Sequence, residues 1–181
     1  MLKGAIDKDI LLKAKEGDLY AFEVILSFFE KSIFNYVLRI VKKIDYAEDI
    51  TQDTFIKVYK HHENIDVEKN IKTWIFTIAT NTTYDFLRNK KRKNEISFED
   101  NFETIADTKS YYKEEGMEYD IERALGNINI EYKNALILFY QQGFEYKEIA
   151  EILNIPINTV KTHISRGKEQ LKEQLQSYGS R

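Results

Sequence analysis

Apolar residues recur every three or four positions along this 181-residue chain, over long stretches without a helix breaker. That spacing forms one apolar face on an α-helix, whereas a half-buried strand would show strict alternation, which is hard to find here. The chain has one proline and seven glycines, so few positions interrupt a helix. The sequence therefore predicts an all-α protein.

Three helices are expected in the N-terminal half. The first opens at Asp18, a suitable N-cap. The second begins near Asp45, where Glu48 has the spacing of a capping box. The third spans residues 70–93. Further helices are expected over residues 121–125, 131–142, 146–153 and 158–175.

Acidic side chains concentrate between the two helical parts. Residues 95–120 hold nine acidic and two basic residues, and apolar periodicity fades there. Such a segment buries too little apolar surface to offset the entropy of ordering, so we interpret it as a linker with at most a short helix over residues 110–118. We expect two small helical domains, residues 1–94 and 121–181, joined by an acidic linker, residues 95–120.

The sequence contains no pattern typical of an enzyme. It has no cysteine, no glycine-rich phosphate loop and no His-x-x-x-His pair, and the adjacent His61 and His62 would point to different sides of a helix. No apolar run approaches the ~20 residues that a membrane-spanning helix needs, and the N-terminus has no signal-peptide core. We expect a cytoplasmic binding protein with no cofactor, no metal and no catalytic residue.

Residues 146–171, YKEIAEILNIPINTVKTHISRGKEQL, have the pattern of a helix-turn-helix. Ala150 is small enough to let two helices approach, and Asn154 tolerates the left-handed backbone of a turn. Pro156 precedes the second helix, which starts at Ile157 or Asn158, with Asn158 a reasonable N-cap. The alternative is a generic helical hairpin with a solvated polar face, but the agreement of several positions favours the motif.

If the second helix of this motif lies in the major groove, its N-terminal half faces base edges and phosphates. Lys161 and Arg166 are suited to guanine edges or phosphates, and the hydroxyl side chains to either. The expected DNA-contacting residues are Asn158, Thr159, Lys161, Thr162, His163, Ser165 and Arg166. Repressors, response regulators and sigma factors all use this motif, so it predicts DNA contact without indicating the class of protein.

The class is indicated by the N-terminal half. AEDITQDTFIKVYKH (residues 47–61) and NIKTWIFTIATNTTYDFLRNKKRK (residues 70–93) resemble the second conserved domain of sigma factors, and residues 17–41 resemble its leading helix. Residues 146–171 are similar to the fourth conserved domain, and the acidic linker stands where the third is missing. This layout resembles the extracytoplasmic-function sigma factors. The resemblance implies a protein that binds core RNA polymerase and directs promoter-specific transcription initiation.

The resemblance also implies a polymerase-binding helix at residues 47–59, which corresponds to the helix that docks on the clamp coiled coil of the largest polymerase subunit. The implied contact residues are Asp49, Gln52, Asp53, Phe55 and Ile56. Four of them, all except Phe55, share one helix face because their spacings fall near one turn. Without the resemblance, these acids would be interpreted as a solvated face.

The helix at residues 70–93 corresponds to the part that melts the start site and contacts the minus-ten element. Single-stranded DNA is bound by planar side chains beside a basic track. The expected minus-ten residues are Lys72, Trp74, Asn81, Tyr84, Asp85, Arg88, Lys90, Lys91 and Arg92. Asn81 and Asp85 are suited to hydrogen-bonding an extruded base. The alternative places Trp74, Phe76 and Phe86 in the core and treats the basic run as a soluble helix end.

The second helix of the C-terminal motif corresponds to the part that contacts the minus-thirty-five element. This chain departs from the family there, with Asn158 where glycine is frequent and Thr162-His163 where many members have serine and arginine. Lys133 also replaces a usual arginine and lacks its planar fork. These departures leave the fold intact and bear on which bases are contacted.

Two other classes compete with this interpretation. A two-component or quorum-type transcription factor would carry an upstream domain with parallel strands, whereas residues 1–94 look helical. An enzyme or scaffold with an accidental helix-turn-helix would require the N-terminal motifs to be coincidental as well. The net charge of -3 predicts weak binding to duplex DNA by the chain alone, since counterion release scales with the phosphates neutralised. Core polymerase and promoter DNA are the expected partners, together with an anti-sigma factor, often membrane-anchored in this family.

Overall fold

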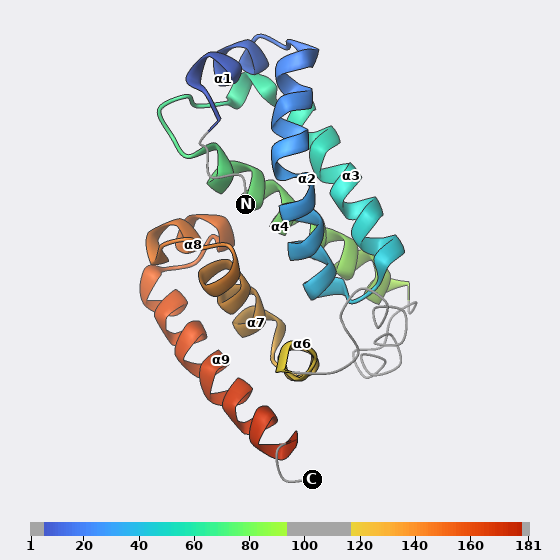
Figure 1. Ribbon diagram of the computed structural model, residues 1–181, viewed down its shortest axis with the longest axis vertical. Coiled ribbons are helices and arrows are strands. Elements are labelled where there is room, and N and C mark those ends of the chain that lie inside the picture. Colours follow the sequence, from blue (N-terminus) through green and yellow to red (C-terminus); the bar gives the residue numbers. More distant parts are fainter. Residues whose placement is uncertain (1–5, 94–116, 179–181) are drawn as a thin grey trace.

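The computed structural model describes residues 6–93 and 117–178, which form two helical lobes (Figure 1). The N-terminal lobe contains α1 (Lys8–Lys15), α2 (Leu19–Val41), α3 (Ile44–Lys60), the short η1 (His62–Asn64) and α4 (Ile71–Arg92). The C-terminal lobe contains α6 (Met117–Gly126), α7 (Ile130–Leu136), its π-helical continuation η3 (Ile137–Gln141), α8 (Tyr146–Leu153) and α9 (Ile157–Tyr178). The all-α prediction is confirmed, while most of the predicted linker, and residues 110–116 of the short helix considered within it, lie outside the described residues.

Side-chain caps explain two of the N-terminal boundaries. Asp18 Oδ1 accepts a hydrogen bond from the backbone N–H of Ala21 at 2.7 Å, and Asn70 accepts one from the N–H of Lys72 at 3.0 Å. The predicted capping box at Asp45 is wrong, because α3 begins one residue earlier and its N-cap makes no side-chain hydrogen bond. Asp45 lies instead in the first turn of α3, where a negative charge is favourable beside the helix dipole.

The N-terminal core lies between α2, α3 and α4, with α1 packed against α2. Its fully buried side chains include Ile25, Ile33, Ile50, Ile75 and Phe76. Helix α1 was not predicted from the sequence, since a helix of eight residues offers too few turns for a clear apolar stripe. None of the helices described in the two lobes is long and apolar enough to cross a membrane.

The C-terminal lobe contains the predicted helix-turn-helix, formed by α8 and α9. Asn154 ends α8 with φ 51° and ψ 49°, the left-handed conformation expected of it. The Pro156 carbonyl accepts hydrogen bonds from the N–H groups of Thr159 and Val160 at 2.8 and 3.1 Å. Helix α9 therefore starts directly after Pro156, and Asn158 lies inside its first turn rather than at the N-cap position.

The two lobes are packed against each other, with α8 beside α4 and α7 beside α2 (Figure 1). Phe76 of α4 and Phe144, which precedes α8, meet edge to face with ring centroids 5.0 Å apart. Both rings are buried, with 0% and 2% exposure. Nothing in the linear pattern had indicated this contact.

Candidate polymerase and nucleic-acid interfaces

A groove of about 900 Å³ runs between α2 and α3 on the outer face of the N-terminal lobe. Its lining is mostly apolar, and the side chains that form it include Leu19, Phe22, Leu26, Phe34, Ile56 and Tyr59. Its rim is charged, with Glu48, Asp49 and Gln52 of α3 at one part and Glu30, Lys31 and Lys60 at others. An exposed apolar groove of this kind suits an amphipathic helix, and Glu48 and Asp49 suit basic residues on that helix.

The residues expected to bind polymerase lie at this groove or beside it. Asp49, Gln52, Asp53 and Ile56 are exposed on one face of α3, and Ile56 has 44% of its surface accessible. Phe55 is only 4% exposed, so it supports the groove from below and offers little surface to a partner.

The expected minus-ten residues of α4 are divided between two faces. Asn81, Asp85, Arg88, Lys91 and Arg92 are exposed. Asp85 accepts a hydrogen bond from Arg88 at 3.3 Å, while Lys90 lies 5.1 Å from the ring centroid of Tyr46. These residues form a polar and basic row along the outer face of α4.

Three further members of the expected set point elsewhere. The Lys72 ammonium donates to the Gln142 carbonyl and lies 4.5 Å from the ring centroid of Phe144, and burial lowers its pKa. Tyr84 accepts a hydrogen bond from Asn134 Nδ2 at 2.8 Å, and burial raises the pKa of its phenol. Trp74 is partly buried against the core. The C-terminal lobe therefore covers Lys72 and Tyr84 in this conformation.

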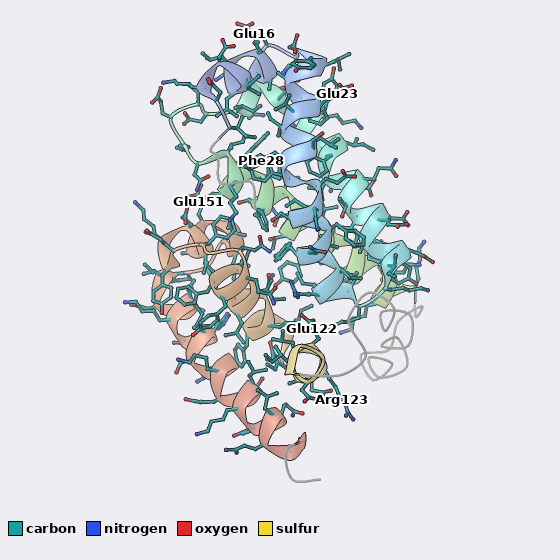
Figure 2. All side chains as sticks on the ribbon, in the orientation of Figure 1. Glu16, Glu23, Phe28, Glu122, Arg123 and Glu151 are labelled. Atoms are coloured by element: carbon teal, nitrogen blue, oxygen red, sulfur yellow. The ribbon has the colours of Figure 1, made fainter. Side chains whose placement is uncertain are left out.

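The N-terminal lobe has a second groove that the sequence does not indicate. It has a volume of about 910 Å³, lies between α1, α2 and the segment before α4, and contains Phe28, which Figure 2 labels. Lys8, Lys31, Lys69 and Lys72 line it together with Asn35 and Asn70, and two of these lysines form ion pairs, Lys8 with Glu68 and Lys69 with Asp66. These cations come from three separate segments, so no single stretch of sequence shows their proximity.

The polar side chains of α9 mostly face solvent. Asn158, Lys161, Thr162, Ser165 and Arg166 are exposed, and Thr159 is half-buried. The exposed members of the set lie on one face of the N-terminal half of the helix, and their contact with DNA stays a prediction.

His163 differs from its neighbours because it points toward α7. Its side chain is 14% exposed, its ring centroid lies 5.2 Å from that of Tyr132, and Nε2 lies 3.8 Å from Glu131. Arg166 also contacts Tyr132, donating a hydrogen bond to its hydroxyl at 3.2 Å. This geometry suits a role for His163 in seating α9 on α7 and leaves it little surface for DNA.

A third groove, of about 600 Å³, opens on the C-terminal lobe between α6, η3 and α9. Its apolar side chains include Leu125, Leu136, Ile137, Tyr140, Leu171 and Leu175. Tyr140 has 59% of its surface accessible. The C-terminal lobe therefore also offers an apolar surface that suits a protein partner.

Two family profiles match the chain. The profile described as Sigma-70 region 2 matches residues 29–93, and that described as Sigma-70, region 4 matches residues 118–171. The ECF RNA polymerase sigma factor SigW of Bacillus subtilis (strain 168) is 31% identical over 184 residues, which cover 93% of this chain and 96% of that protein. The ECF RNA polymerase sigma-E factor of Haemophilus influenzae is 27% identical, covering 97% and 98%.

Solved structures share the same architecture. The sigma factor RpoE of Bartonella quintana, in complex with the anti-sigma factor NepR, superimposes with a TM-score of 0.70 at 25% identity, covering 86% of this chain and 96% of that one. CnrH, in complex with the cytosolic domain of CnrY, superimposes with a TM-score of 0.72 at 17% identity, covering 95% and 98%. The second likeness concerns the fold alone.

Proposed function

Because this chain belongs to the extracytoplasmic-function (ECF) family of RNA polymerase sigma factors, we propose which of its surfaces perform each part of initiation. It binds core RNA polymerase and directs promoter-specific transcription initiation. We assign polymerase binding and minus-ten contact to residues 1–94, minus-thirty-five contact to residues 121–181, and the connection between them to residues 95–120. One observation supports this division. The apolar groove lies between α2 and α3, whereas the two exposed polar surfaces lie on other helices, α4 and α9.

The polymerase-binding surface is the α2–α3 groove with the exposed face of α3. Ile56 supplies an accessible apolar anchor, and Asp49, Gln52 and Asp53 supply acceptors around it. A helix bearing arginine or lysine would bury its apolar face in the groove and pair its charges at the rim. Such anchors carry most of the binding free energy at protein interfaces.

Minus-ten contact is assigned to α4. Its exposed row from Asn81 to Arg92 combines amide and carboxylate groups for an extruded base with cations for the phosphates. Lys72 and Tyr84 extend this surface once the C-terminal lobe moves away. The groove around Phe28 adjoins this surface, and its Lys31 and Lys72 offer two further cations to unpaired nucleotides.

Minus-thirty-five contact is assigned to the exposed face of α9. Lys161 and Arg166 are suited to guanines or phosphates, while Asn158, Thr162 and Ser165 contribute neutral hydrogen-bonding groups. Thr159 is a candidate at the edge of this face.

An anti-sigma factor is a further proposed partner. The similar RpoE and CnrH structures are complexes, with the anti-sigma factor NepR and with CnrY, respectively. The apolar grooves on the two lobes are the surfaces that such a partner would cover. Polymerase and promoter are cytoplasmic, so we place the chain in the cytoplasm, where a membrane-anchored anti-sigma factor would hold it near the membrane.

In vitro transcription with purified core polymerase tests the assignments. On a promoter that this chain recognises, Ile56→Glu is expected to reduce transcript by reducing polymerase affinity, whereas Lys161→Ala should act through the minus-thirty-five element. Glu23→Gln, at an exposed position of α2 labelled in Figure 2, is the control and should be neutral. Tight operator binding without polymerase, and no promoter-dependent transcript with it, would contradict the proposal.

A further inference from the structure

The contact between the lobes includes buried polar groups that pair across it. Asn134 of α7 is fully buried, and it accepts a hydrogen bond from the Tyr36 hydroxyl at 2.6 Å while its amide donates to Tyr84 at 2.8 Å. Tyr36 lies on α2 and Tyr84 on α4, so one side chain of the C-terminal lobe joins two helices of the N-terminal lobe. Buried polar groups lose these partners if the lobes separate, and water must then replace them.

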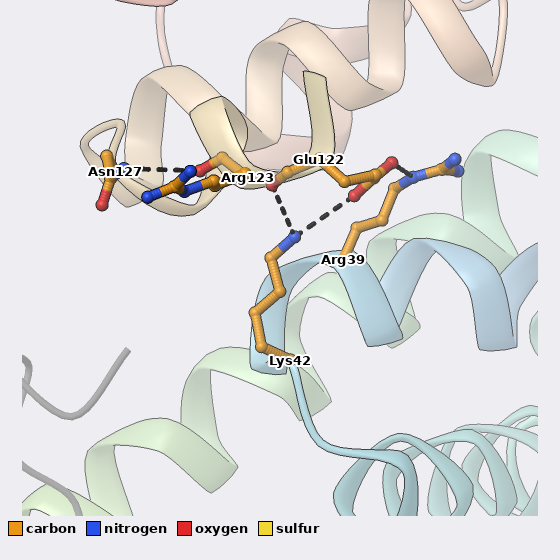
Figure 3. A network of polar contacts seen from close by, with 5 residues as sticks. All are labelled: Arg39, Lys42, Glu122, Arg123 and Asn127. Atoms are coloured by element: carbon orange, nitrogen blue, oxygen red, sulfur yellow. Dashed lines mark hydrogen bonds and ion pairs between the residues drawn. The ribbon is translucent and has the colours of Figure 1, made fainter. Parts of the chain in front are cut away.

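A second set of contacts joins α2 to α6 and is centred on Glu122 (Figure 3). Arg39 Nε lies 2.5 Å from Glu122 Oε1, and Lys42 Nζ lies 3.2 Å from Oε2 and 3.3 Å from the Glu122 carbonyl oxygen. The side chains of Lys42 and Glu122 are only 7% and 9% exposed. Removing one partner of such a buried pair leaves an uncompensated charge, which is strongly unfavourable.

The backbone at Lys42 supports a specific role for its side chain. Lys42 follows α2 in the left-handed conformation, with φ 57° and ψ 17°. Glycine adopts this conformation without cost, whereas a lysine is strained in it. Lys42 thus ends α2, with its N–H donating to the Leu38 carbonyl, and its side chain leaves the helix end toward Glu122.

In the closed arrangement, in which the two lobes pack against each other, the C-terminal lobe covers the beginning of α4. Glu148 of α8 accepts hydrogen bonds from Asn70 at 2.8 Å and Thr73 at 3.2 Å. Lys72, which lies between Asn70 and Thr73 in the sequence, donates a hydrogen bond to the carbonyl of Gln142. The first turn of α4 therefore has its polar groups directed at the C-terminal lobe, where DNA has no access to them.

The closed arrangement is also too short for a promoter. Elements centred near minus ten and minus thirty-five are about 25 base pairs apart, which is about 85 Å of B-form DNA. Helix α8 packs against both α4 and α9, and packed helices have axes about 8–10 Å apart, so α4 and α9 lie about 20 Å apart across α8. The lobes must separate before both helices contact one promoter.

We propose that the Arg39–Lys42–Glu122 network is a latch that holds the free chain closed and keeps the start of α4 covered until core polymerase separates the lobes. This inference rests on the proposed function, because it assigns the covered surface to minus-ten DNA. It adds a conformational requirement that the division of surfaces does not by itself contain.

The latch can be tested by fluorescence energy transfer in the full chain. The sequence has no cysteine, so cysteines introduced at the exposed Glu23 and Glu151 take a dye pair without competition (Figure 2). Transfer should be high in the free parent protein and should fall when core polymerase is added. In the free Glu122→Gln variant, transfer should already be low, with the open-to-closed ratio raised on the order of 100-fold.

Two further variants keep the result interpretable. Lys42→Gly removes a latch cation and also relieves the left-handed backbone strain, so it should open the lobes without weakening the fold of α2. Glu173→Gln removes an exposed carboxylate of α9 and should leave transfer unchanged. Far-ultraviolet circular dichroism must show the same helix content in all three variants.

Binding of short single-stranded DNA of mixed sequence supplies an independent measurement. Glu122→Gln should bind it at least tenfold more tightly than the parent. Once core polymerase is bound, the two proteins should have equal affinity for this DNA. Unchanged transfer and DNA affinity in both latch variants, or high transfer in the polymerase complex, would overturn the latch. If such a result accompanied normal promoter-dependent transcription, the sigma assignment would stand. Absence of any transcript with the parent chain would instead overturn the proposed function.

Discussion

Replacing Gly167 with alanine measures how closely α9 must approach α7. A Cβ atom built at Gly167 lies 2.9 Å from Leu136 Cδ1, 3.0 Å from Leu136 Cγ and 3.2 Å from Tyr132 Cβ. The Cδ1 methyl is able to rotate away, but Cγ and Cβ lie close to the backbone of α7. Helix α7 or α9 must therefore move to accept the methyl group.

Two opposing contributions set the size of the effect. Alanine is favoured over glycine inside a helix by about 1 kcal/mol. Overpacking a well-filled interior costs about 1–3 kcal/mol, and the upper part of this range applies because two of the three close atoms are near backbone. We expect Gly167→Ala to lower the free energy of unfolding by about 1–2 kcal/mol in total.

Urea unfolding of the full chain, followed by circular dichroism, measures this change. Gly126→Ala is the matched control, because a Cβ there has nothing within 4 Å and its backbone φ is not in the left-handed region. It should be neutral or slightly stabilising. Gly167→Ala should also weaken minus-thirty-five binding, since α9 carries the proposed contact residues. A Gly167→Ala protein as stable as Gly126→Ala would refute the close approach of α9 to α7.

Three further predictions concern charge and backbone conformation. Burial, the nearby Lys42 charge and the weaker opposing attraction of Glu122 place the pKa of Lys133 at about 7, below its ordinary 10.5. The closed form thus lacks a proton that the open form binds between these values, so raising the pH above 7 should favour closure by up to about tenfold per pH unit, measured by energy transfer. Lys133→Met should reduce this dependence, and Lys42 and Lys72, whose pKa values burial also lowers, should account for what remains. Lys161→Ala should reduce the salt dependence of holoenzyme binding to promoter DNA by about one phosphate contact if Lys161 pairs with a phosphate, and an unchanged slope would exclude that pairing. Asn154→Ala should destabilise the C-terminal lobe by about 1–2 kcal/mol in thermal unfolding, because alanine is strained at its φ of 51°, whereas Asn154→Gly should not.

Features that depend on residues close together along the chain could be predicted from the sequence. The spacing of apolar side chains determined the helices, because each helix must bury one face. Asp18 and Asn154 marked a helix start and a helix end through their own local hydrogen bonding and backbone preference. The exposed acidic face of α3 and the polar face of α9 were predictable for the same reason, since residues one turn apart share a face.

The faces of α4 could not be assigned from its sequence. Its inner face is rich in threonine, and Thr80 and Thr83 are buried with their hydroxyls donating to carbonyls four residues earlier at 2.7 Å. The protons of these hydroxyls are bound within the helix, so polar residues can be buried here and the buried face resembles a solvated one in the sequence. Lys72 and Tyr84 therefore looked as accessible as Asn81.

By itself, the sequence determined that this protein is helical, that it has two parts, and that it belongs with sigma factors. Only the tertiary structure decided that the lobes are closed, with Glu122 held by Arg39 and Lys42 at a separation of 80 residues or more along the chain. Local patterns report on contacts within a few turns of a helix. Pairing across the lobes depends instead on where whole helices pack, which the periodicity of any single helix does not contain.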